Sequence, residues 1–228
     1  MKGKLIIIES GSDASGKATQ TQKLFERLLD EKYKVKKVTF PDYNSDSSAL
    51  VKMYLSGDFG QHPEDVSPYV ASTFYAVDRF ASYKTKWGKY FKDGGIILSD
   101  RYTTSNMVHQ AAKIKDMSQK NGFLEWLWNF EFNVYGLPVP DCVLFLDMPP
   151  EYSKLLMEQR ANKFTGNDEK DIHERNYNYL LESYNNSLYI AKKYNWFKIN
   201  CIEKNKLLTI EEIHEMIYLK VKEVLVSE

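Results

Sequence analysis

Residues 11–17 of the chain read Gly11-Ser12-Asp13-Ala14-Ser15-Gly16-Lys17. This stretch directly follows a short apolar run typical of a buried strand, residues 4–9, and precedes a helical pattern that begins at Thr19. Glycines at this spacing let the backbone wrap so that several N–H groups point at one phosphate, and the following helix adds its positive end. The stretch therefore predicts a nucleotide phosphate loop in which Lys17 supplies a positive charge to the phosphate oxygens.

Two positions qualify this prediction. The strict loop pattern places Ser or Thr after the lysine as a magnesium ligand, whereas this chain has Ala18 there and Thr19 one position later. A Mg²⁺ ion at such a site would be held largely by water and by the phosphates. Asp13 would be repelled by a triphosphate, so it either faces a second ligand or caps the following helix. The residues expected to bind the nucleotide phosphates are Gly11, Ser12, Asp13, Ala14, Ser15, Gly16, Lys17, Ala18 and Thr19.

Strand-like and helical patterns alternate along the rest of the chain. They predict strands at residues 4–9, 35–40, 95–99, 141–147 and 196–200, and helices at residues 19–31, 66–91, 121–135, 168–194 and 209–226. The inner strands are apolar throughout, which is typical of parallel strands buried on both faces. The alternation predicts one α/β domain over residues 1–228 with a parallel sheet. The least regular segments are residues 43–48, 117–122 and 162–170, and the last has the polar composition of a mobile flap.

The composition argues against several other classes of protein. Apolar residues make up 43% of the 228 residues, which is enough for a sizeable core. Lys+Arg and Asp+Glu are 31 each, so no net charge attracts nucleic acid or an anionic membrane, and no apolar stretch approaches the ~20 residues of a membrane span. Cys142 and Cys201 lie far apart in strand-like runs and are expected to be buried free thiols. We expect a cytoplasmic protein with no nucleic-acid or membrane partner.

Further motifs follow in chain order, and three of them come where predicted strands end. They are Phe40-Pro41-Asp42-Tyr43, Phe74-Tyr75-Ala76-Val77-Asp78-Arg79, Asp100-Arg101-Tyr102, Ser105-Asn106, His109-Gln110, Gly136-Leu137-Pro138-Val139-Pro140-Asp141 and Leu146-Asp147-Met148-Pro149-Pro150-Glu151. Open α/β sheets bind their ligands beyond the carboxyl ends of the strands. Taken together, these motifs resemble the thymidylate kinase family over about residues 4–200.

The resemblance implies a fold and an activity. The implied fold is a three-layer α/β/α P-loop kinase fold with a five-stranded parallel sheet and a short flexible lid at about residues 160–172. The implied activity is transfer of the γ-phosphate of ATP to dTMP, giving dTDP, with Mg²⁺ as the cofactor. Members of the family are commonly homodimers packed through helices, and the resemblance implies the same for this chain. The aromatic stretch at residues 126–132 has a helical pattern and lies far from the motifs, so it is expected in the core or at a subunit interface.

The resemblance also implies roles for single residues of the acceptor site. Phe40 and Pro41 would line the base and sugar pocket, with Tyr43 where many members have an arginine. Tyr75 would stack on thymine, and Arg79 and Arg101 would grip the acceptor phosphate. Ser105 belongs to the same motif as Asn106, which would reach the pyrimidine edge. His109 takes the place of a bulky aromatic that favours deoxyribose, Asp13 would contact the 3′-hydroxyl, and Asp100 would face magnesium, directly or through water.

Phosphate transfer between two anions needs positioning and charge neutralisation rather than a general base, because the attacking phosphate oxygen is already ionised. The expected catalytic residues are Lys17, Arg101 and Arg160, the last at the start of the lid. Some family members have an arginine inside the phosphate loop, where this chain has Ala14 and Ser15. The missing charge would come from the lid, from Arg160 with Lys163 or Lys170 as further candidates.

Alternatives stay open at the level of sequence. Taken singly, Arg79 and Arg101 could be ion-paired or surface arginines, and Tyr75 could be ordinary core packing. The chain could phosphorylate another nucleotide or a deoxynucleoside. It could also be a nucleotide-binding regulator without activity. Ala18 and the loop residues Ala14 and Ser15 favour this reading, and Lys17, Arg101 and Arg160 oppose it.

Overall fold

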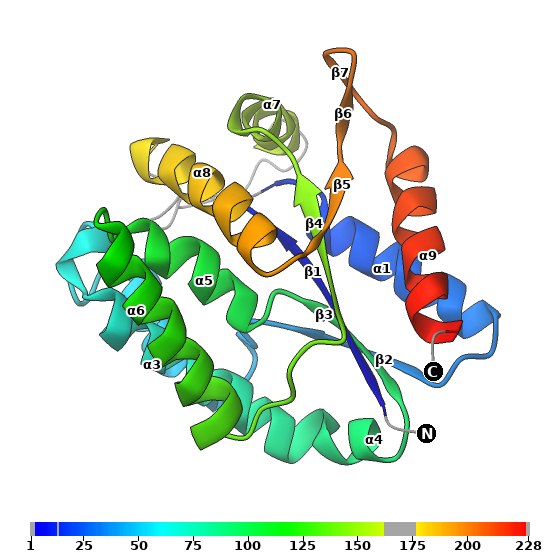
Figure 1. Ribbon diagram of the computed structural model, residues 1–228, viewed down its shortest axis with the longest axis horizontal. Coiled ribbons are helices and arrows are strands. Elements are labelled where there is room, and N and C mark those ends of the chain that lie inside the picture. Colours follow the sequence, from blue (N-terminus) through cyan, green and yellow to red (C-terminus); the bar gives the residue numbers. More distant parts are fainter. Residues whose placement is uncertain (1–2, 13, 162–176, 227–228) are drawn as a thin grey trace.

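The computed structural model describes residues 3–12, 14–161 and 177–226. A parallel sheet runs through its centre (Figure 1) in the order β2 (Val35–Thr39), β3 (Ile96–Asp100), β1 (Lys4–Ser10), β4 (Cys142–Asp147) and β5 (Phe197–Asn200). The five predicted strands are confirmed, and each of their ends lies within one residue of its predicted position.

The uniformly apolar central strands serve two separate cores. In β1, Leu5 and Ile7 join one apolar cluster, while Ile6 and Ile8 join the other. Successive side chains of a strand point to opposite faces, so a strand covered on both sides must be apolar at every position. The edge strand β2 differs because its burial alternates along its length.

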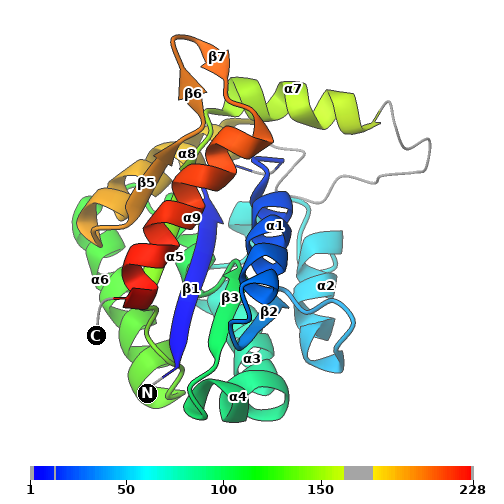
Figure 2. The ribbon, with the colours of Figure 1, turned by 90° about the vertical axis from the view of Figure 1, so that its right-hand side faces the viewer.

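Helices cover both faces of the sheet (Figures 1 and 2). One face carries α1 (Lys17–Asp30) and α9 (Ile210–Val226), and the opposite face carries α3 (Pro68–Ser82), α5 (Thr103–Ala112), α6 (Met117–Trp128) and α8 (Tyr177–Lys193). The predicted three-layer α/β/α architecture is confirmed.

One long predicted helix and one segment predicted to be irregular differ from the structure. The helix predicted at residues 66–91 is α3, a π-helical turn η3 (Tyr83–Trp87) and α4 (Gly88–Lys92) in succession. The segment 117–122, predicted to be irregular, is the first half of α6. That prediction was wrong because Asp116 caps the helix, its carboxylate accepting a hydrogen bond from the Gln119 N–H at 2.8 Å.

Several short elements were not predicted. They are η1 (Asp46–Ser48), α2 (Ala49–Ser56), η2 (Pro63–Asp65), α5, α7 (Pro150–Ala161) and a hairpin of β6 (Ile202–Glu203) and β7 (Lys206–Leu207). The hairpin lies beside α7 (Figure 2), where Tyr152 Oη donates to the Asn205 carbonyl at 3.2 Å. The predicted lid, residues 160–172, falls almost wholly outside the described residues.

Both cysteines behave as predicted. Cys142 and Cys201 are buried free thiols, and burial raises the pKa of each to about 12. They therefore stay protonated and unreactive at neutral pH. Within the described residues, no helix combines the length and the apolar character needed to cross a membrane.

The phosphate loop is held against α8 by a close approach at Gly11. A Cβ atom at this position would lie 2.2 Å from Ser187 Oγ and 2.9 Å from Tyr184 Cα. Only glycine permits this distance between loop and helix. The start of the loop therefore depends on the position of α8.

Lys113 connects three segments of the chain near the carboxyl ends of the strands. It follows α5, and its Nζ donates to Tyr54 Oη in α2 at 2.9 Å and to the Val66 carbonyl before α3 at 3.1 Å. Burial lowers the pKa of Lys113 from its ordinary 10.5 to about 8, with Glu64 acting weakly in the opposite direction.

This burial predicts a pH dependence of stability. Between about pH 8 and pH 10.5 Lys113 is neutral in the folded chain but still protonated in the unfolded chain. The unfolded state then binds more protons, so the free energy of unfolding rises with pH across this window, by at most about 3 kcal/mol. Urea unfolding at about pH 7.5 and about pH 10.5 should show wild type gaining stability relative to Lys113→Met. The exposed Lys89→Met variant is the control, and an equal pH response in wild type and Lys113→Met would contradict the expectation.

Candidate active site

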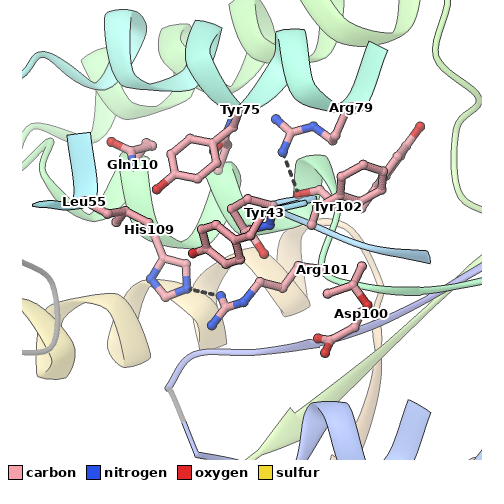
Figure 3. A pocket seen from close by; sticks show the side chains of 14 residues that line it. Tyr43, Leu55, Tyr75, Arg79, Asp100, Arg101, Tyr102, His109 and Gln110 are labelled. Carbon is pink, nitrogen blue, oxygen red and sulfur yellow. Dashed lines mark hydrogen bonds between the residues drawn. The ribbon is translucent and has the colours of Figure 1, made fainter. Parts of the chain in front are cut away.

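Two adjoining cavities open at the carboxyl ends of β1, β2 and β3. The larger has a volume of about 290 Å³, and its lining side chains include residues from β2, α2, α3, β3 and α5 (Figure 3). The smaller, of about 160 Å³, lies at the phosphate loop. Asp100 and Arg101 line both cavities. A ligand in each cavity would therefore meet its neighbour at these two residues.

The smaller cavity is bordered by the phosphate loop and the first turn of α1. Its loop residues are Ala14, Ser15, Gly16, Lys17 and Ala18. Ala14 and Gly16 have positive φ angles of 53° and 86°, which bend the chain around the cavity. The N-terminus of α1 adds positive potential, so the cavity suits an anion.

Lys17 lies against its own loop. Its Nζ donates to Ser10 Oγ at 2.6 Å and to the Ser12 carbonyl at 3.0 Å. Ser15 Oγ also donates to Ser10 Oγ, at 2.7 Å. These bonds order the loop and hold the ammonium group beside the cavity.

The other predicted loop residues lie outside the cavity lining. Gly11 packs against α8, and Ser12 Oγ donates to the Met148 carbonyl at 3.0 Å. Thr19 is half-buried in the first turn of α1 and borders neither cavity. Asp13 lies outside the described residues.

Arg101 takes up an unusual backbone conformation at the junction of the cavities. Its φ angle is 67°, and its N–H donates to the Ile8 carbonyl of β1 at 3.3 Å. Such left-handed backbone in a residue other than glycine costs free energy and is common at functional sites. The Arg101 guanidinium donates through Nη1 to His109 Nε2, 3.1 Å away (Figure 3).

Asp100 is the candidate for magnesium. Its Oδ1 is buried, and among the described residues it has no hydrogen-bond partner. Within the described part of the chain no three metal-ligating side chains cluster. A single carboxylate next to a phosphate site fits Mg²⁺ held mainly by phosphates and water, as predicted for a loop with Ala18.

Glu9 is a buried carboxylate beside the site that lines neither cavity and that the sequence analysis did not predict. The carboxylate is fully buried at the end of β1, where Oε2 accepts hydrogen bonds from Thr104 Oγ1 at 2.7 Å and Ser105 Oγ at 2.6 Å. It joins the base of the phosphate loop to the start of α5. The available signal was a carboxylate inside an otherwise apolar strand.

Arg79 and Glu131 form a buried ion pair at the inner end of the larger cavity. The exposed fraction of Arg79 is 1% and that of Glu131 is 0%. Arg79 donates to Glu131 through Nε at 2.7 Å and Nη2 at 2.5 Å, and its Nη1 lies 3.4 Å from the Tyr102 carbonyl (Figure 3). The charge of Arg79 is therefore compensated, and unlike Arg101 it does not line the phosphate-loop cavity.

Tyr102 supports this end of the cavity as a neutral phenol. Its ring is buried, and its Oη donates to the Pro138 carbonyl at 3.1 Å. Burial raises the pKa of Tyr102 well above its ordinary value, with the nearby Glu131 carboxylate adding to the rise.

The remaining walls come from residues predicted for the acceptor site. Phe40 follows β2, and Tyr75 packs edge-on against Tyr54 with ring centroids 6.3 Å apart. Tyr43 is 51% exposed, while His109 is buried. The larger cavity brings together every described acceptor residue of the prediction: Phe40, Pro41, Tyr43, Tyr75, Arg79, Arg101, Ser105, Asn106 and His109.

The predicted lid cations lie beyond what the structure describes. Lys163 and Lys170 fall outside the described residues, and for Arg160 the description covers only its place in the backbone of α7. Besides Glu9, the sequence reading also missed Leu55 and Gln110, which line the larger cavity, and Glu131 behind it.

Comparison with known proteins agrees with the resemblance. The family model described as thymidylate kinase matches residues 8–217. The chain is 27% identical over 199 residues to the thymidylate kinase of Schizosaccharomyces pombe, covering 82% of this chain and 87% of that one. It is 28% identical over 180 residues to the thymidylate kinase of an Exiguobacterium species, covering 78% and 79%.

A solved structure supports the fold. The thymidylate kinase of Candida albicans aligns with a TM-score of 0.64 at 22% identity, covering 97% of this chain and 92% of that one. Since the family match covers nearly the whole chain, the protein belongs to the thymidylate kinase family.

Proposed function

We propose that this protein transfers the γ-phosphate of ATP to dTMP, giving dTDP and ADP. The observation that carries the proposal is that Asp100 and Arg101 line both the phosphate-loop cavity and the larger cavity. ATP in the smaller cavity and a nucleoside monophosphate in the larger one would meet phosphate to phosphate at this junction. Family membership and the named relatives support the same reaction.

Phosphate transfer requires charge neutralisation at that junction. Arg101 would bind the acceptor phosphate with its planar fork, which holds two oxygens at once. Lys17 would face the ATP phosphates, and Arg160 remains the lid cation that we propose for the transition state. Mg²⁺, when bound, would be held by the phosphates and by water beside Asp100, and it would supply positive charge against the phosphate oxygens. We propose no general base, because the attacking oxygen is already an anion.

The inner end of the larger cavity suits a thymine or uracil base. Arg79 is neutralised by Glu131 but retains N–H donors, and Asn106 uses its Nδ2 on the Ser72 carbonyl at 3.3 Å, which leaves its Oδ1 as an acceptor. Thymine and uracil pair an accepting carbonyl with a donating N–H, whereas cytosine presents an amino group in place of the carbonyl. We therefore assign Arg79 to the base, and Arg101 alone to the acceptor phosphate.

An acceptor panel tests the proposal. Coupled ADP release should be greatest with dTMP, lower with dUMP and small with dCMP, UMP, AMP and thymidine. Turnover should disappear when EDTA removes magnesium. Turnover with thymidine but not with dTMP would refute the proposed acceptor, and no turnover with any acceptor would favour a regulator without activity.

Replacement of Arg101 tests the phosphate clamp. Arg101→Ala should lower kcat/KM for dTMP by roughly 10²- to 10³-fold, with a much smaller loss of ATP affinity, because its charge acts where the phosphates meet. Arg27→Ala, on the surface between α1 and α9, is the matched control. Loss of folded protein in Arg101→Ala, rather than loss of rate, would assign Arg101 a structural role instead.

Replacement of Arg160 tests the proposed lid cation. Arg160→Ala should reduce turnover more than acceptor affinity.

We also propose a homodimer that packs through α3 and α6. Five aromatic rings lie in contact along α3, α6 and the segment 129–135 that follows α6: Tyr69, Trp126, Phe130, Tyr135 and Phe80. Beside them Val70, Val77 and Val134 are 47%, 41% and 67% exposed. A contiguous apolar face of this kind is typical of an interface.

Sedimentation tests the dimer. Wild type should sediment at twice the mass of one chain, and a variant combining Val77→Lys with Val134→Lys should shift toward a single chain because it buries charge in the interface. Leu29→Lys, on α1 across the sheet, should remain a dimer. A wild-type protein that sediments as one chain at micromolar concentration would refute this arrangement.

A further inference from the structure

Glu131 is a buried carboxylate on what is otherwise the apolar stripe of a helix. It lies in η4 (Asn129–Val134), a π-helical turn that continues α6. Leu124 and Leu127 precede it at helical spacing and are fully buried, as Glu131 is itself. A charged group in this position is costly unless donors surround it. The segment that follows the π turn also bonds its backbone, since the Leu137 N–H donates to the Glu131 carbonyl at 3.0 Å.

Donors from two other helices meet this carboxylate. Oε2 accepts from Arg79 Nε at 2.7 Å and from Thr103 Oγ1 at 2.7 Å. Oε1 accepts from Arg79 Nη2 at 2.5 Å and lies 3.5 Å from Asn106 Nδ2. Arg79 belongs to α3, and Thr103 and Asn106 belong to α5, so Glu131 fixes the two helices relative to each other at the inner end of the cavity.

These bonds decide which atoms the cavity presents to a ligand. Arg79 commits Nε and Nη2 to Glu131, which turns the Nη1 side of the guanidinium toward the Tyr102 carbonyl and the cavity (Figure 3). Asn106 directs Nδ2 to Glu131 and to the Ser72 carbonyl, so Oδ1 is the atom left to accept. Glu131 itself does not line the cavity.

We propose that Glu131 is a positioning residue that sets the base selectivity of the acceptor site, an inference that rests on the proposed dTMP kinase function. It acts through Arg79 and Asn106 and does not touch the substrate. Its carboxylate keeps a donor and an acceptor side by side, the pattern complementary to thymine and uracil and opposed to that of cytosine.

The Glu131→Gln variant separates this role from a merely structural one. A side-chain amide has one oxygen and one NH₂ group, so it cannot accept from all four donors. Arg79 then loses part of its fixed orientation, and Asn106 is free to turn its NH₂ group toward the cavity. The ratio of kcat/KM for dTMP to kcat/KM for dCMP should fall by roughly ten- to a hundredfold. A general loss of folded enzyme would lower the apparent kcat/KM for both acceptors equally and leave their ratio unchanged.

Two further variants keep the test decisive. Glu131→Asp retains the charge opposite Arg79 but withdraws the oxygens by one methylene, so it should fold and show a smaller fall in the same ratio. Glu125→Gln, on the exposed side of α6, should leave the ratio and the melting temperature unchanged. The KM for ATP should stay constant in all three variants, because the phosphate-loop cavity is separate.

The outcomes distinguish this inference from the proposed function. A wild-type enzyme that fails to prefer dTMP over dCMP overturns both. A selective wild type whose ratio is unchanged in Glu131→Asp, and in Glu131→Gln where that variant folds, overturns the role of Glu131 alone. A fall of the ratio in these variants, with Glu125→Gln behaving as wild type, supports it.

Discussion

The pairing of β1 with β3 is the constraint on which both cavities depend. The parallel register sets Ile8 opposite Asp100, and the Arg101 N–H continues the ladder by donating to the Ile8 carbonyl at 3.3 Å. Because both strands run in the same direction, the phosphate loop after β1 and the Asp100-Arg101 pair of β3 emerge at the same edge of the sheet. A slip of one residue in this register would turn Asp100 to the opposite face and separate the cavities.

Local pairing of charge then divides the larger cavity into two chemically different ends. The chain has no net charge, so an anion must be met by cations gathered at one place. At the inner end, Glu131 cancels the charge of Arg79, which leaves a neutral, directional set of donors and acceptors. At the outer end, Arg101 stands beside the phosphate loop and its Lys17. A nucleotide is itself divided in this way, with a neutral base and an anionic phosphate, and its orientation in the cavity follows from that match.

The predictable parts of this protein are those that local sequence determines. The five strands and the phosphate loop follow from apolar runs and glycine spacing, and the acceptor residues follow from the family resemblance that the motifs carry. Glu131 could not be found in this way, because its partner Arg79 is 52 residues away and the intervening sequence gives no sign that they meet. The stretch around Glu131 reads as an apolar helix, whereas the partners of its carboxylate come from α3 and α5. Glu9 was hidden for a similar reason, since its donors Thr104 and Ser105 come from another element. The start of α6 was missed although Asp116 gives a local capping signal.

The composition of the phosphate loop bears on where catalytic charge must come from. Where some relatives have an arginine, this loop has Ala14 and Ser15, and the Ser15 hydroxyl is used within the loop on Ser10. Lys17 is bound to the same serine, so the loop is a compact unit that orders one ammonium group but adds no second cation. Among the described residues that line the smaller cavity, the remaining cation is Arg101, which must also serve the acceptor. One guanidinium shared between two phosphates cannot offset the charge of both, since a triphosphate and a monophosphate together carry several negative charges. The remaining negative charge has to be offset by further cations, a part that we propose for Mg²⁺ and for Arg160.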